Sequence, residues 1–165
     1  GYITTALKRD VCPDDVRDVA YESMRSLNLA ASEIAVDLGV TGSTDITGFG
    51  LAGHAYERAE ASGVTLEIDL AAVPLLPGAA AMRDDGHKTR ANASNAAHLV
   101  PYVTSEHDAD ALDVVFDPQT SGGLLLAVAS GSVDDLMTRG RDAGLEAIAV
   151  VGEVKERGAT PIVVR

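Results

Sequence analysis

The residues best suited to chemistry lie in one short segment, Thr44-Asp45-Ile46-Thr47-Gly48-Phe49-Gly50. Glycine lets backbone N–H groups approach a ligand closely, and the start of a helix adds unpaired donors with a partial positive charge. Both features suit phosphate. A carboxylate just upstream, Asp45, suits a divalent metal that bridges phosphate oxygens, although a helix N-cap or turn aspartate is an equally simple interpretation of its spacing. The segment therefore predicts half of a metal–phosphate site, with Asp45 at the metal and Thr47, Gly48 and Gly50 facing phosphate.

The same glycines fit a second pattern. Gly48, Gly50 and Gly53 spell G-x-G-x-x-G, and acids follow about 20 residues later at Glu67 and Asp69. That dinucleotide-binding motif requires a buried apolar strand directly before its first glycine, whereas the preceding residues here are mostly polar. A glycine-rich turn that begins a helix and binds nothing is the remaining alternative.

A second polar segment, Phe116 to Gly123, separates two apolar runs, Leu112 to Phe116 and Leu124 to Val128. Proline does not fit inside a central strand, so Pro118 predicts a loop between two strands. Asp117 is predicted to cap this turn, with a second metal-binding carboxylate as the alternative. The loop also supplies amide, hydroxyl and glycine groups that suit phosphate or an interdomain face, namely Gln119, Thr120, Ser121 and Gly122.

Together, the strings T-D-I-T-G-F-G-L-A-G-H and F-D-P-Q-T-S-G-G-L-L resemble the C-terminal half of the selenophosphate synthetase (selenide, water dikinase) family. More broadly they resemble the superfamily of aminoimidazole ribonucleotide synthetase, which includes enzymes of purine synthesis and hydrogenase maturation. The resemblance extends to Gly1–Lys8, Val73–Ala79 and Val151–Val154, and so covers most of the chain. The Asp-Pro-Gln-Thr-Ser-Gly-Gly string is its most specific part.

This resemblance implies an α/β (α+β) fold, with three α/β/α layers around a mixed sheet, and residues 1–165 as a single C-terminal domain. It implies part of an enzyme that converts ATP, selenide and water into selenophosphate, AMP and phosphate with Mg²⁺. The family's N-terminal ATP-binding domain, which binds most of the ATP, is absent from these residues. The resemblance also implies that Asp45 binds metal, that the full-length enzyme is a homodimer formed mainly through the N-terminal domain, and that the isolated chain is inactive.

Two other functions remain open. The chain could be a non-catalytic module of the same fold that binds a nucleotide or metabolite. It could also be a domain of a purine-synthesis or hydrogenase-maturation relative, which the segment from Asp117 to Gly123 disfavours. A beginning at Gly1 instead of Met is interpreted as that of a processed chain or a fragment, and the resemblance favours a fragment.

The composition sets further limits. The net charge is −12, which argues against binding of nucleic acid or of an anionic membrane surface. A single cysteine, Cys12, cannot form an internal disulfide, so a reducing cytoplasm is expected. No apolar run approaches about 20 residues, so no transmembrane helix is expected. Because the chain is acidic, positive charge for a phosphate ligand has to come from metal or from another domain.

The pattern of apolar residues predicts the elements that position these loops. Helices are expected from Pro13 to Leu27, Leu29 to Leu38, Leu51 to Gly63, Pro77 to Gly86 and Val133 to Ala143. Strands are expected at Tyr2 to Leu7, Val64 to Leu70, Leu124 to Val128, Ala147 to Val154 and Pro161 to Val164. Loops are expected at Val40 to Gly50 and at Asp84 to Asn95, which is polar and lacks a period.

Overall fold

The computed structural model describes residues 1–165 as eight α-helices and six strands, with short 3₁₀ turns between some of them. The helices are α1 Tyr2–Lys8, α2 Asp14–Arg25, α3 Leu29–Asp37, α4 Gly50–Ser62, α5 Ala79–Asp84, α6 Arg90–Leu99, α7 Ala109–Phe116 and α8 Val133–Asp142. The strands are β1 Gly42–Asp45, β2 Val64–Ile68, β3 Val103–Ser105, β4 Leu124–Ala127, β5 Gly152–Glu156 and β6 Ile162–Val164. None of the helices has the length and apolar character needed to cross a membrane.

The larger sheet has the strand order β3-β6-β2-β5 and is mixed. Strand β6 runs parallel to β2 and β3, whereas β5 runs antiparallel to β2 and forms one edge of the sheet, with β3 at the other. Strands β1 and β4 form a separate antiparallel pair. The expected mixed α/β fold is therefore confirmed, and the arrangement is consistent with the three-layer form.

Helix α4 packs on the larger sheet through two fully buried alanines, Ala55 and Ala59, while the buried Ala52 faces α6 and α7. Small side chains allow the helix to approach β2 and β6 closely, where Ile68 and Ile162 are buried against it. Helices α6 and α7 pack beside α4 and add Leu99, Val115 and Phe116 to the core. Helix α4 ends at Gly63, whose φ of 65° is the left-handed conformation that suits glycine at a helix C-terminus.

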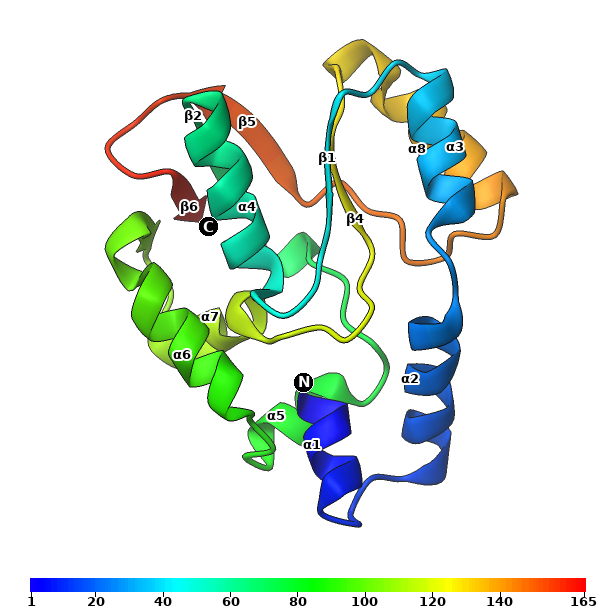
Figure 1. Cartoon of the computed structure of the whole chain (residues 1–165), viewed down its shortest axis with the longest axis vertical. Coiled ribbons are helices and arrows are strands. Elements are labelled where there is room, and N and C mark those ends of the chain that lie inside the picture. The colour runs from blue at the N-terminus through cyan, green and yellow to red at the C-terminus, as the bar shows by residue number, and fades with distance from the viewer.

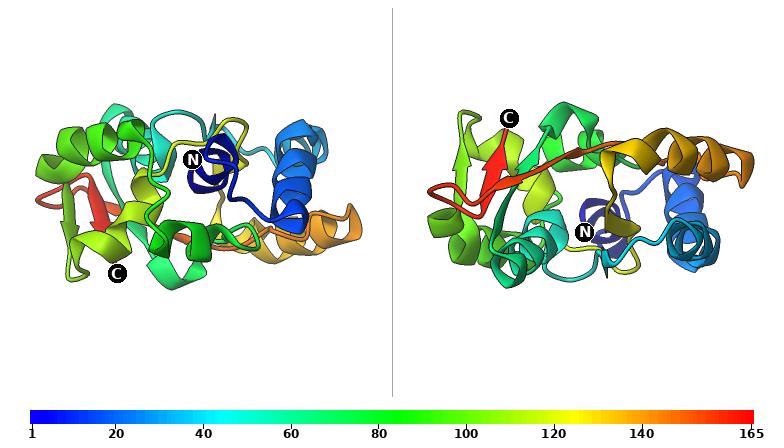
Figure 2. Two further views of the ribbon diagram at one scale, coloured as in Figure 1. Left: turned by 90° about the horizontal axis from the view of Figure 1, so that it is seen from below. Right: turned by 90° about the horizontal axis from the view of Figure 1, so that it is seen from above.

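Helices α1, α2 and α5 form a second apolar group, away from the sheet. Its buried residues are Tyr2, Ile3, Ala6, Ala20, Ala79 and Met82. Figure 1 shows β1 and β4 passing between the sheet with α4 and the pair α3 and α8. Figure 2 shows the same arrangement from below and above, with the sheet and α6 at one end and α2, α3 and α8 at the other.

The strand expected at Tyr2 to Leu7 is wrong, because these residues form helix α1. Tyr2 and Ala6 are four residues apart and are both buried, which is helical spacing, while Thr4 lies on the other face. The loose apolar–polar alternation over these six residues is compatible with both the period of two of a strand and the period of 3.6 of a helix. Burial against α5 selects the helix.

The loop expected at Asp84 to Asn95 is also wrong in its second half, where α6 begins at Arg90. Thr89 caps this helix, since its hydroxyl accepts from the Asn92 N–H at 3.0 Å. The buried face of the helix includes a polar side chain, Asn92, beside Leu99. Because Asn92 on the inner face is polar, apolar residues do not recur there at helical spacing, and the sequence pattern did not predict this helix.

The apolar run before Pro118 is a helix instead of a strand. Asp108 caps α7 by accepting from Ala111 N–H at 2.8 Å, and the run from Leu112 to Phe116 continues that helix. The loop at Pro118 therefore joins a helix to strand β4, correcting the predicted strand-to-strand connection.

The remaining expectations are largely confirmed, with shorter boundaries. The expected helices correspond to α2, α3, α4, α5 and α8, and the strands to β2, β4, β5 and β6. Strand β5 begins only at Gly152, so the first part of the strand expected from Ala147 is absent, and the loop expected at Val40 to Gly50 contains β1. Strand β4 is half-buried over most of its length, and it pairs with β1 alone.

Candidate functional site

The two segments singled out in the sequence lie against each other. Strands β1 and β4 pair in a register that places Asp45 opposite Leu124. The pairing continues beyond the strands: Ile46 N–H donates to the Gly123 carbonyl at 2.9 Å, and Gly122 N–H donates to the Ile46 carbonyl at 3.0 Å. We call residues 45–50 the first loop and residues 117–123 the second loop. Gln119 N–H donates to the Thr47 carbonyl at 3.0 Å and closes the contact between them.

Two of the predicted glycines are required by this close approach. Gly50 has φ of 69°, and a Cβ there would lie 2.9 Å from the Phe116 carbonyl carbon. A Cβ at Gly122 would lie 2.4 Å from the Ile46 carbonyl oxygen. Gly48 differs, because a Cβ there would meet no atom within 4 Å. Packing therefore explains Gly50 and Gly122, whereas Gly48 faces open space.

Several donors in the two loops are free of partners within the chain. The backbone N–H groups of Thr47, Gly48 and Phe49 donate to no acceptor in the protein, and neither do those of Thr120 and Ser121. The hydroxyls of Thr120 and Ser121 also make no internal hydrogen bond, although the Thr47 hydroxyl lies 3.1 Å from His54 Nε2. Neither loop contains lysine or arginine. The loops thus present neutral donors to solvent, an arrangement that suits an anion.

Asp45 is exposed at the end of β1, directly before this set of donors. No group of three or more His, Cys, Asp or Glu side chains is arranged to hold a metal anywhere in the chain. Asp45 could therefore supply one carboxylate ligand. Mg²⁺ commonly uses one or two carboxylates together with substrate phosphate oxygens and water, so a single carboxylate beside unpartnered N–H donors would suit this ion together with a phosphate.

Asp117 points into the protein and not toward solvent. Its side chain is buried, and Oδ2 lies 2.5 Å from the amino group of Gly1. Burial raises the pKa of this carboxyl, while the Gly1 ammonium opposes the shift. Asp117 therefore anchors the second loop to the first residue of the chain, whereas no backbone N–H of the Pro118 turn donates to its side chain as the predicted cap would require.

Gln119 is turned toward the same carboxylate. Its Nε2 donates to the Asp117 carbonyl at 3.0 Å and to Asp117 Oδ2 at 3.2 Å. The donors of this amide are engaged inside the loop. Among the residues predicted to face phosphate, Thr120 and Ser121 are therefore more accessible as donors than the side chain of Gln119.

Sequence reasoning missed two asparagines that hold the loops. Asn95 Nδ2 lies 3.0 Å from the Gly48 carbonyl and 3.0 Å from the Phe116 carbonyl. Asn28 Nδ2 donates to the Gly122 carbonyl at 3.0 Å. The sequence pattern assigns Asn95 no role, because it lies at the end of a segment expected to be a loop. Its spacing of three residues from Asn92 is the pattern that marks a shared helix face.

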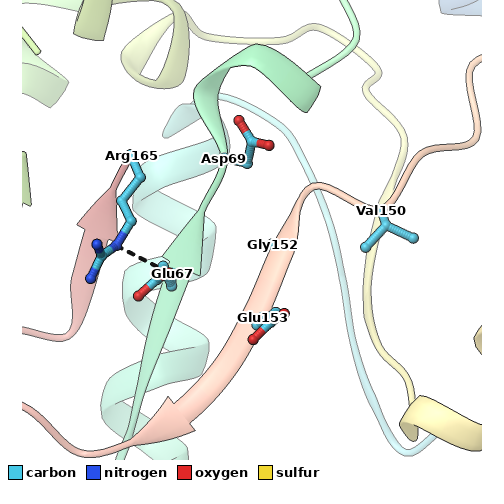
Figure 3. A pocket seen from close by; sticks show the side chains of 6 residues that line it. All are labelled: Glu67, Asp69, Val150, Gly152, Glu153 and Arg165. Atoms are coloured by element: carbon cyan, nitrogen blue, oxygen red, sulfur yellow. Dashed lines mark ion pairs between the residues drawn. The ribbon is translucent and has the colours of Figure 1, made fainter.

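A separate pocket lies on the sheet, away from the two loops (Figure 3). It has a volume of about 330 Å³ and is lined by Glu67, Asp69, Val150, Gly152, Glu153 and Arg165. Glu67 pairs with Arg165 at 3.0 Å, and Asp69 accepts from Ala71 N–H at 3.0 Å. Both acids of the dinucleotide pattern thus have structural partners.

The strands exclude the dinucleotide-binding arrangement. That motif needs the strand before the glycines and the strand after the helix to lie parallel in one sheet. Here β1 pairs only with β4, whereas β2 belongs to the other sheet. The Gly48, Gly50 and Gly53 spacing therefore arises in a different fold.

These features define a class of protein. It is a mixed α/β domain in which a glycine-rich helix start is joined through its backbone to a Thr-Ser-Gly-Gly loop. The family model described as "AIR synthase related protein, C-terminal domain" matches residues 4–165, and the chain belongs to this family.

Curated relatives and a solved structure agree with this assignment. The chain is 42% identical, over all its length, to a protein of Caldanaerobacter subterraneus subsp. tengcongensis named "Selenide, water dikinase", and covers 48% of that protein. It is 40% identical to a protein of the same name from Citrifermentans bemidjiense, with 99% of this chain and 47% of that protein covered. The chain thus spans about half the length of these relatives.

The crystal structure of the protein tt0281 from Thermus thermophilus shares the fold. Its TM-score is 0.60 at 19% sequence identity, and the match covers 99% of this chain and 45% of that one. At this identity the likeness concerns the fold alone.

Proposed function

We propose that this chain is the C-terminal domain of an ATP-dependent selenophosphate synthetase, in which ATP, selenide and water give selenophosphate, AMP and phosphate. The observation that carries the proposal is the pairing of the two loops, which gathers unpartnered N–H and hydroxyl groups beside Asp45. The names of the relatives supply the reaction. This reaction implies that the enzyme is cytoplasmic.

In this proposal the protein acts on the triphosphate group of ATP. Phosphoryl transfer depends mainly on positioning and on neutralising charge. The N–H groups of Thr47, Gly48 and Phe49, with those of Thr120 and Ser121, orient phosphate oxygens by hydrogen bonding. Asp45 offers one ligand for Mg²⁺, and the bound ion would neutralise charge on those oxygens.

The rest of the site comes from a second domain. These loops carry no cationic side chain and no cysteine. We propose that an N-terminal ATP-binding domain supplies the missing charge and most of the nucleotide contacts, and that the full-length enzyme is a homodimer. The isolated chain is accordingly expected to produce no AMP from ATP and selenide.

A chimera tests the proposal. The C-terminal half of the Caldanaerobacter relative is replaced by this chain, which matches it over its full length. We expect selenide-dependent AMP formation, and a loss of about a hundredfold or more when Asp45→Ala removes the metal ligand. The unmodified relative is the positive control, and Glu106→Ala, which removes an exposed carboxylate outside the loops, is the matched control.

The outcomes separate the candidate functions. A folded chimera that binds Mg²⁺ and ATP but forms no AMP contradicts the synthetase proposal and favours a non-catalytic binding module. Formation of aminoimidazole ribonucleotide from its precursor by the chimera would instead favour the purine-synthesis relatives.

A further inference from the structure

One side chain outside the predicted site contacts the first loop and the helix that leads into the second loop. Asn95, on α6, places Nδ2 3.0 Å from the Gly48 carbonyl and 3.0 Å from the Phe116 carbonyl. An amide nitrogen carries two hydrogens, so one group satisfies both acceptors. We propose that Asn95 is a positioning residue that fixes the peptide between Gly48 and Phe49 and thereby aims its N–H at the bound anion. This inference rests on the proposed function.

The geometry of the peptide bond supports this role. The chain contains no cis peptide, and in a planar trans peptide the carbonyl and the N–H point in opposite directions. With the Gly48 carbonyl bonded to Asn95, the Phe49 N–H points away from α6. That N–H has no acceptor within the chain. Since Gly48 lacks a side chain, this interaction directly restrains the peptide's orientation, in addition to the turn that the Gly50 N–H closes on the Thr47 carbonyl at 3.0 Å.

The second hydrogen bond ties the first loop to a rigid element. The last four carbonyls of a helix lack partners within it, and Phe116 is the final residue of α7. Asn92, one turn earlier on α6, donates to the Asp113 carbonyl at 3.0 Å. Both asparagines therefore satisfy the end of α7. Only Asn95 also reaches the first loop.

This difference provides matched variants. Asn95→Ala removes both donors. Asn95→Asp keeps the shape but places a carboxylate, which only accepts, against two carbonyls. Asn95→Ser keeps one donor and serves if the other variants do not fold. Ser94→Ala is the neighbouring control, because Ser94 is exposed and has no internal side-chain hydrogen bond. Asn92→Ala removes support for α7 and the contact with the Tyr2 hydroxyl, but no contact with the first loop.

The first measurement is ¹⁵N relaxation of the chain without ligand. We expect the Phe49 N–H order parameter to fall from about 0.85 to below about 0.6 in Asn95→Ala and Asn95→Asp. Ser94→Ala should leave it unchanged, and Asn92→Ala should lower the melting temperature while Phe49 stays ordered. A wild-type order parameter at Phe49 in the folded Asn95 variants would overturn the inference.

The second measurement titrates the same proteins with ATP and Mg²⁺ and follows the Phe49 amide resonance. We expect affinity to weaken about tenfold or more in the Asn95 variants and to hold in Ser94→Ala. Equal affinity in the Asn95 variants and wild type would overturn the positioning role. If wild-type chain shows no shift, autonomous ATP binding fails, and the order parameters alone then decide whether Asn95 fixes the peptide.

Discussion

At the scale of single residues, the candidate site depends on a few groups with separate tasks. Asp45 is the only carboxylate in the first loop, and it is exposed beside free N–H donors. An exposed carboxylate that no other acid assists is a weak metal ligand by itself. In the proposed site, its affinity for Mg²⁺ would therefore depend on the phosphate oxygens that complete the coordination.

We therefore expect Mg²⁺ to strengthen ATP binding by the wild-type chain and not by Asp45→Ala. The loss of this metal ligand should weaken binding of Mg²⁺ with ATP by about tenfold or more. Isothermal titration calorimetry of both forms, with and without Mg²⁺, measures the effect. Glu106→Ala should behave as wild type, since Glu106 is exposed and belongs to neither loop. Mg²⁺-dependent binding that survives in Asp45→Ala would remove Asp45 from the site.

At the scale of elements, the approach of α4 to the end of α7 is set by a glycine. Gly50 combines a left-handed φ with backbone contacts that leave no room for Cβ. Gly48, two residues away, has neither constraint. The two glycines look alike in the sequence, but only one is required by the fold.

Alanine substitutions should separate these two tasks. Gly50→Ala should lower the free energy of unfolding by about 2 kcal/mol or more, because it adds a strained φ and a clash with backbone. Gly48→Ala should change it by less than about 0.5 kcal/mol, as expected for an unconstrained surface position. Urea unfolding measures both. If Gly48→Ala also weakens binding of ATP with Mg²⁺ while stability is kept, the free space at Gly48 serves the ligand; unaltered binding argues against contact there.

The sequence predicted elements well where one apolar face dominates. Alanines at helical spacing and Gly63 marked α4, and the alternation from Val64 marked β2. It failed at α6, whose buried side chain Asn92 is polar, and at α1, which is too short for its period to be distinguished from a strand. Contacts with distant elements decide both cases, and a local pattern does not contain those contacts.

The candidate site was predicted to a similar degree. The two loops were recognised from their glycines and hydroxyls, and the structure joins them. Their supports were missed, because Asn95 and Asn28 act through hydrogen bonds to residues far along the chain. The direction of the Gln119 side chain, toward Asp117, also depends on tertiary burial.

At the scale of the whole molecule, Asp117 connects the second loop to the first residue of the chain. Burial raises the pKa of Asp117 above its ordinary value of 3.8, with the Gly1 ammonium acting in the opposite direction. The folded chain therefore holds this proton at pH values where the unfolded chain has lost it. The resulting stability is fully present below about pH 3.8 and is lost as pH rises through the raised folded pKa.

We thus expect wild type to gain stability relative to Asp117→Asn as pH falls through the raised pKa of Asp117 toward its ordinary value of 3.8. Asparagine keeps the shape without the titration, so the other acids cancel in the difference between the two proteins. Urea unfolding at several pH values measures that difference. A difference that is constant with pH, or that moves in favour of Asp117→Asn on acidification, would show that burial does not control this carboxyl.

The division of the apolar interior has a consequence for cooperativity. The core of α1, α2 and α5 shares no residue with the core around α4, whereas the two clusters around α4 share several partly buried neighbours, including Leu51 and Tyr56. Separate apolar clusters can open as separate units with different free energies. The Gly1–Asp117 pair spans these units. In the isolated chain, fluctuations that release the amino-terminal helices therefore also release an anchor of the second loop, so the rate of such opening limits how long the two loops of that chain stay in place.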